Sequence, residues 1–262
     1  MRQTFLGIVM YCGVCAVAAS PLAAEEQPAG DFFETCLQAR DSKPEQAAKL
    51  YEQFASKNPD APEAVISHVL RGIVLWRDLA DMNKAEEAFT FAAAAAGQDK
   101  LSTAASTLGK KWRARIQMTR IARACHSYYL DEVAYPDNLA QLVEKNLLEG
   151  MDLRDPWNEP FVYAPVDAKF VKSAKQGYRL SSKNADGDAS KIGELLSREK
   201  GFVKAIALKG ITMEQPRTVM VTLKNESLII EEGKTKGGLT VALIDTGRAI
   251  LFSPDYVVVL AR

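Results

Sequence analysis

The stretch from residue 128 to residue 187 decides the fold of this chain. It contains the segments YYLDEVAYP (128–136), DPWNEPFVY (155–163) and YRLSSKNADG (178–187). Pro136 ends the preceding helix because proline lacks the backbone N–H that a helix needs, and Tyr135 can pack back onto the last turn. Asp155 and Pro156 begin a turn that places Trp157 in the core beneath a small sheet. The aromatic and aliphatic residues that follow predict two short antiparallel strands.

The residues before this stretch predict one long helix over 99–132. Its apolar side chains recur every three or four residues, at Leu101, Ala104, Ala105, Leu108, Trp112, Ile116, Thr119, Ala122 and Tyr129. The helix also carries a row of cations with no acid before Asp131, namely Lys110, Lys111, Arg113, Arg115, Arg120 and Arg123. Such a row could face anionic headgroups of a membrane surface or an acidic partner. We favour the alternative, in which neighbouring elements supply acids that pair with the row.

The order of the three segments resembles the soluble domain of the major pseudopilin of type II secretion. In that family a helix ends in Tyr-x-x-Asp-x-x-x-Tyr-Pro, Asp-Pro-Trp-Gly follows, and a strand leads into Leu-x-Ser-x-Gly-x-Asp-Gly. Asn158 stands where relatives have glycine and can take the left-handed conformation. The matching positions here are Tyr128, Asp131, Tyr135, Pro136, Asp155, Pro156, Trp157 and Gly187. The resemblance implies a pseudopilin-like domain over residues 99–195.

The loop that ends the third segment is the candidate metal site. In the family that it resembles, this loop binds calcium through the aspartate before the glycine, backbone carbonyls and a later acidic pair. Asp186 matches the aspartate, but the acidic pair is missing, and only Asp188 and the more distant Glu194 are offered. Calcium prefers six to eight oxygen ligands, so such a site would be weak. A turn held by its own hydrogen bonds is the alternative, and our first expectation is no cofactor.

The N-terminus departs from the pseudopilin pattern. Residues 1–24 have a positive start, an apolar run over 5–19 and small residues at the end, which predicts a cleaved secretory signal peptide. Pseudopilins instead carry a glutamate at the fifth position after a peptidase site, and none follows Gly7 or Gly13 at that distance. We therefore expect an exported protein of the periplasm or cell envelope that does not polymerise.

Residues 25–98 predict helical hairpins. Prolines at positions 44 and 62 begin two of the helices, Asp31 caps the first, and Asn83 caps a fourth that ends near Gly97. The spacing of small and aromatic residues resembles tetratricopeptide repeats, at Ala47, Tyr51, Phe54 and Pro59 and again at Gly72, Ala85, Phe89 and Ala92. The alternative is an unrelated four-helix bundle.

Residues 200–262 predict about six short strands, beginning at Val203, in a small β-sandwich or barrel. Their apolar spacing and glycines resemble the periplasmic domain of secretion-platform and pilus-alignment proteins. The whole chain is thus expected to be α+β, with a helical N-terminal region, a pseudopilin-like centre and a β-domain.

Composition and catalytic residues narrow the function. The 33 basic and 33 acidic residues balance, so no global field would recruit nucleic acid. Two cysteines follow the signal segment, and Cys36 and Cys125 either form one disulfide or, as we favour, are two buried apolar side chains. The chain has two histidines and no nucleophile, phosphate-loop or zinc motif. We therefore expect no enzyme.

The leading hypothesis is an interaction protein whose partners are proteins of a type II secretion or type IV pilus-like assembly. The alternatives are a calcium-dependent or peptide-binding periplasmic module and a general envelope scaffold. Calcium dependence of stability would separate the first two hypotheses.

Overall fold

A computed structural model describes residues 28–95, 99–167 and 175–261 of the chain, and its architecture is α+β, as expected. The predicted signal peptide, residues 1–24, lies outside the described residues. The helices are α1 (Pro28–Asp41), α2 (Pro44–Lys57), α3 (Pro62–Arg77), α4 (Met82–Ala94), α5 (Lys100–Glu132), α6 (Ala140–Glu144) and α7 (Ile192–Lys204). The strands are β1 (Val162–Asp167), β2 (Lys175–Ser181), β3 (Ile206–Thr212), β4 (Thr218–Leu223), β5 (Glu226–Glu231), β6 (Thr235–Lys236), β7 (Leu239–Asp245), β8 (Arg248–Phe252) and β9 (Val257–Ala261).

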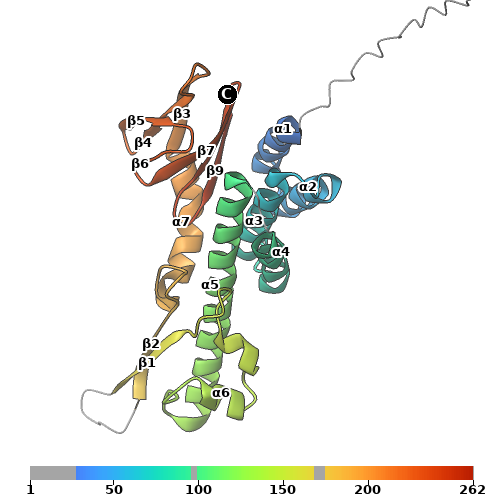
Figure 1. The fold of residues 1–262 in the computed structure, drawn as a ribbon. Helices are drawn as coiled ribbons and strands as arrows, with labels where there is room; N and C mark the ends of the chain where they lie inside the picture. Colours follow the sequence, from blue (N-terminus) through green and yellow to red (C-terminus); the bar gives the residue numbers. More distant parts are fainter. Residues whose placement is uncertain (1–27, 96–98, 168–174, 262) are drawn as a thin grey trace, which may run out of the picture.

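Helix α5 is the central element of the fold (Figure 1). Helices α1–α4 lie on one side of its N-terminal half, and the C-terminal strands lie on the other (Figure 1). Helix α6 and the ribbon of β1 and β2 surround its C-terminal half, and α7 connects the two levels (Figure 1). Every part of the described chain therefore packs directly or indirectly on α5.

The N-terminal helices form consecutive hairpins, each packed on the next. Helices α2 and α3 begin at the predicted prolines, whereas α1 begins at Pro28, before the expected cap Asp31. Helix α4 is capped by Asp81, whose side chain accepts a hydrogen bond from the backbone N of Lys84 at 3.1 Å, and not by Asn83 as expected. The likeness to tetratricopeptide repeats stays a prediction.

Small residues set the distances between these helices. A Cβ added to Gly72 of α3 would lie 2.5 Å from Cε1 of Phe89 in α4. A Cβ added to Gly109 of α5 would lie 2.7 Å from Cβ of Ala92 in α4. Both crossings are therefore closer than any larger side chain would allow.

The long helix agrees with its prediction. Its cap, Asp99, accepts a hydrogen bond from the backbone N of Ser102 at 2.9 Å. The helix stops at Val133, which has a left-handed φ of 58°. Its buried residues from Leu101 to Ile116 belong to the core shared with α1–α4, and those from Ala114 to Cys125 belong to the core beneath β1 and β2.

The C-terminal region contains a helix that the sequence pattern did not predict. Helix α7 extends to Lys204, so the first strand begins at Ile206 and not at Val203. The strands form two antiparallel sheets, ordered β3-β4-β5 and β6-β7-β8-β9, which share one apolar core. Of the two expected forms, the described strands correspond to a sandwich, and they do not close into a barrel.

Within the described residues, none of the helices combines the length and the apolar character that crossing a bilayer requires.

Candidate functional site

Asp155 joins two of the three sequence segments that decide the fold. Its buried carboxylate accepts hydrogen bonds from the backbone N of Trp157 and of Glu159, both at 3.0 Å. The other carboxylate oxygen accepts from Oγ of Ser182 at 2.9 Å and from Nδ2 of Asn184 at 3.1 Å. Four donors satisfy the carboxylate, so burial does not leave a polar group unpaired. This aspartate therefore holds the turn at 155–159 against the loop at 182–187.

The turn itself has the predicted geometry at one position and differs at another. Asn158 has a φ of 66°, the left-handed conformation expected where relatives have glycine. Trp157 is only half-buried and packs on the edge of the second core, so the expectation that its ring lies inside the core was wrong. The turn lies at the surface, so its neighbours cover the indole only in part.

Tyrosines close the end of the long helix. The ring of Tyr135 lies 4.7 Å from that of Tyr129 and 4.9 Å from that of Tyr178, centroid to centroid. The hydroxyl of Tyr163 donates to the carbonyl of the buried Pro136 at 2.8 Å. Tyr128 packs against the same core, whereas Asp131 is exposed. Apart from Asp131, these motif residues pack against one another or against the second core.

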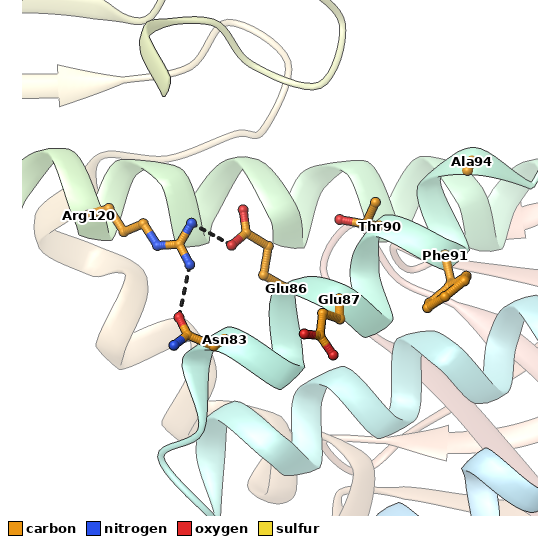
Figure 2. A pocket seen from close by; sticks show the side chains of 7 residues that line it. All are labelled: Asn83, Glu86, Glu87, Thr90, Phe91, Ala94 and Arg120. Carbon is orange, nitrogen blue, oxygen red and sulfur yellow. Dashed lines mark hydrogen bonds and ion pairs between the residues drawn. The ribbon is translucent and has the colours of Figure 1, made fainter. Parts of the chain in front are cut away.

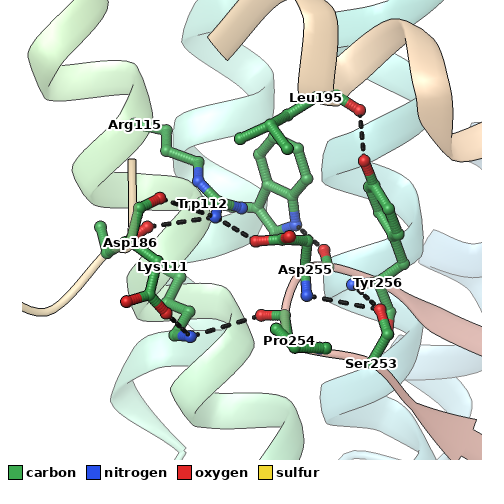
Figure 3. Close-up of polar contacts among 10 residues, drawn as sticks. Lys111, Trp112, Arg115, Asp186, Leu195, Ser253, Pro254, Asp255 and Tyr256 are labelled. Atoms are coloured by element: carbon green, nitrogen blue, oxygen red, sulfur yellow. Dashed lines mark hydrogen bonds and ion pairs between the residues drawn. The ribbon is translucent and has the colours of Figure 1, made fainter. Parts of the chain in front are cut away.

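Two cationic side chains of α5, Lys111 and Arg115, contact the Asp186 loop. Nζ of Lys111 lies 2.7 Å from Oδ2 of Asp186 (Figure 3). The guanidinium of Arg115 donates from Nη2 to the carbonyls of Ala185 at 3.1 Å and of Asp186 at 3.4 Å. Asp188, the other candidate ligand, accepts from the backbone N of Ser190 at 2.9 Å and caps a 3-10 turn. The backbone supports this turn with left-handed φ values at Asp186 and at Gly187.

Arg115 also connects this loop to the C-terminal sheets. Its side chain, 1% exposed, forms an ion pair with Asp255, which precedes β9 (Figure 3). Its Cζ lies 4.5 Å from the ring centroid of Trp112, a distance at which the ring face attracts a cation. The sequence placed Arg115 in the basic row but offered no sign that it alone would be buried. Asp255 was missed because its partner is 140 residues away.

Half of the basic row on α5 pairs with acids of other elements. Lys111 pairs with Asp186, Arg115 with Asp255, and Arg120 with Glu86 of α4. This pairing follows the alternative that we favoured over contact with a membrane surface.

A surface hollow of about 550 Å³ lies beside Arg120 (Figure 2). Arg120 donates to Oδ1 of Asn83 at 3.0 Å and pairs with Glu86, which closes one end of the hollow. At the other end Phe91 is 62% exposed and stacks on His68 at 5.3 Å. The hollow is lined by Asn83, Glu86, Glu87, Thr90, Phe91 and Ala94 of α4 and by Arg120 of α5. Aromatic side chains are enriched at protein contact surfaces, so the exposed ring of Phe91 makes the hollow a candidate for one.

The cysteines and histidines are not arranged for catalysis. Cys36 and Cys125 are free and buried in different cores, so the disulfide considered above is not formed. Burial raises the pKa of the Cys125 thiol to about 12, which keeps it protonated. Burial lowers the pKa of His68, and His126 is exposed on α5. In the described part of the chain, no three metal-ligating side chains come together.

A long helix, a short helix, an Asp-Pro-Trp turn and a two-stranded ribbon that leads into an Asp-Gly loop define a pseudopilin-like domain. Comparison with family models agrees, because residues 103–194 match the family described as type II secretion system (T2SS), protein G. The match spans the long helix, the ribbon and the Asp186 loop, and it relates this part of the chain to the secretion system of the cell envelope. No curated protein matches the chain, and no solved structure matches it.

Proposed function

We propose that this protein is an exported envelope protein that binds proteins of a type II secretion or type IV pilus-like assembly, without becoming a filament subunit and without catalysing a reaction. The family match over residues 103–194 supports the link to secretion. Members of such assemblies act through protein contacts, so the partners are proteins.

The covered N-terminal half of α5 is the observation that carries the proposal. Leu101, Leu108, Trp112 and Ile116 are all at most 8% exposed. On one side Oγ of Ser106 donates to the carbonyl of Ala93 at 3.1 Å. On the other side Nζ of Lys111 reaches the carbonyl of Pro254 at 3.4 Å. A helix can pack with copies of itself in a filament only through a free face, and α4 and the C-terminal strands already cover this one.

Surfaces outside the pseudopilin-like domain are then available for partners. The hollow on α4 offers Phe91, and the C-terminal sheets offer Ile229, which is 53% exposed. The two residues lie on different sides of α5, so they report on separate contacts.

Photocrosslinking in intact cells tests the proposal. A photoreactive residue would replace Phe91 in one strain and Ile229 in another, with exposed Lys183 as a control position. We expect secretin, platform or pilin-like subunits to be recovered from Phe91 or Ile229 above the level from Lys183. Recovery of the protein inside purified filaments would contradict the non-polymerising role. Recovery of only unrelated envelope proteins would contradict the link to secretion.

Export has its own test. N-terminal sequencing of the protein from the envelope fraction should give Glu25 as the first residue, because cleavage is expected after Ala24. A mature protein that still begins with Met1 would contradict cleavage.

A further inference from the structure

A pocket that is partly open to solvent lies where the N-terminal helices, α7 and β9 meet. Its volume is about 390 Å³, within the range of small-molecule sites. A space of this size at the junction of three parts of the chain is therefore a candidate ligand site.

The walls of the cavity are mostly apolar. They include Ala39, Ala47 and Ile73 from the helical hairpins, Val203 from α7, and Val257 and Val259 from β9. Four of the six, Ala39, Ala47, Ile73 and Val257, are at most 5% exposed. Such walls favour an apolar chain, because a polar ligand would lose its hydrogen bonds to water on entry.

Four of the charged side chains that line the cavity are already paired with one another. Arg77 donates from Nε to Oδ1 of Asp78 at 3.1 Å and forms a second ion pair with Glu199. Lys200 pairs with Asp78 at 2.7 Å. These groups satisfy one another, so they would not bind a second polar molecule without breaking existing pairs.

The charged lining residues carry an excess of positive charge. Four cations (Arg40, Arg77, Lys200 and Lys204) and two acids (Asp78 and Glu199) line the cavity, which gives 4 − 2 = +2, and Arg40 is paired with Asp41 just outside it. Lys204, at the end of α7, is exposed and has no ion pair within the described parts of the chain. A negatively charged group would meet this lysine without displacing another partner.

We propose that the cavity binds an anionic amphiphile of the fatty-carboxylate class, with its chain between the helical hairpins and β9 and its carboxylate beside Lys204. The ligand would fill the space between α1–α3, α7 and β9, so its binding would stabilise the packing of the N-terminal helices on the C-terminal part of the chain. This function is independent of the contacts with secretion partners proposed above.

Binding of dodecanoate to the full-length protein tests the charge and the chain together. The probes are dodecanoate, dodecyl maltoside and dodecyltrimethylammonium, which share one chain length, each used below its micelle-forming concentration. We expect saturable calorimetric binding of dodecanoate and a rise in Tm that grows with its concentration. The uncharged probe should bind about fivefold more weakly, and the cationic probe more weakly still. Equal effects of all three probes, or no binding of dodecanoate, would overturn the proposal.

Variants locate the binding in the cavity. Lys204→Glu should weaken dodecanoate binding on the order of fivefold, the value of losing an exposed ion pair. Lys191→Glu is the matched control, because it makes the same charge change just before α7 and does not line the cavity. Val203→Trp should fill the space and reduce affinity at least tenfold while the circular dichroism spectrum stays unchanged. Parent-like binding by both Lys204→Glu and Val203→Trp would place the ligand elsewhere and contradict the proposal.

Discussion

The indole of Trp112 donates a hydrogen bond from Nε1 to the backbone carbonyl of Asp255 at 2.9 Å, although the two residues are 143 positions apart in the sequence. The same ring stacks on Phe89 at 6.1 Å and lies 6.3 Å from the ring of Tyr256. Trp112 is fully buried, and it contacts residues of the helical hairpins and of the C-terminal strands at once.

Trp112→Ala should therefore lower the free energy of unfolding by about 3–5 kcal/mol, the range for removing a large buried aromatic side chain. Urea unfolding followed by circular dichroism measures the change. Trp157→Ala is the matched control, and we expect about 2 kcal/mol because that ring is only half-buried. A larger loss for Trp157→Ala than for Trp112→Ala would contradict the packing described for both rings.

Arg115→Met should destabilise the protein by about 2–4 kcal/mol, because it removes the buried partner of Asp255 and of two loop carbonyls. A double-mutant cycle with Asp255→Asn should give a coupling energy of at least about 1 kcal/mol. Arg115→Lys should recover little, since an ammonium cannot reproduce the fork of donors that a guanidinium offers. Additive effects of the two single substitutions would show that the pair adds nothing to stability.

Gly72→Ala should cost about 1–3 kcal/mol, because the added Cβ would lie 2.5 Å from the ring of Phe89. Gly201→Ala in α7 is the matched change in another helix, where an added Cβ meets no atom within 4 Å. It should raise stability by about 0.5–1 kcal/mol through helix propensity. Thermal melting of both variants beside the parent checks the pair, and destabilisation by Gly201→Ala would be the contrary result.

Stability should change with pH through Glu63, a buried acid at the start of α3. Burial is the main cause that raises its pKa, and the nearby Asp99 adds to the rise. A raised pKa in the folded state means that stability is full below the unfolded pKa and falls as the pH rises through the folded one. Glu63→Gln should therefore match the parent near pH 4 and become more stable than the parent toward pH 7. Parallel curves of unfolding free energy against pH would contradict this.

Calcium should leave the melting temperature unchanged. Lys111 already neutralises Asp186, and Arg115 already binds the carbonyls of the loop. The comparison is between melts in chelator and in millimolar calcium, where even a weak site would stabilise the fold. A rise in Tm that is lost in Asp186→Ala would instead establish the calcium site.

The sequence predicted the central domain well because its signals are local. Pro136 lies just beyond the end of the long helix, Asp155 and Pro156 start a turn, and Asn158 takes a left-handed φ. Helix α7 was missed although Ile192, Leu196 and Glu199 are buried at helical spacing, because Gly193 and Gly201 weaken the helical signal.

Other features depend on the tertiary arrangement and leave no pattern along the chain. The acid that Arg115 meets comes from a distant loop, and so do the walls of the cavity beside Lys204. The partial burial of Trp157 also depends on the tertiary arrangement, because the neighbouring elements determine how much of its side chain is exposed.

The long helix has one more consequence. Its 33 residues extend for about 50 Å at 1.5 Å per residue. Both of its halves are fixed in apolar cores, so its length does not vary as a flexible linker would. Ala92 of α4, next to the exposed Phe91, packs on Gly109 in the first third of this helix, and the exposed Leu130 lies in its last turn. Two molecules bound at Phe91 and at Leu130 would therefore be held a fixed distance apart.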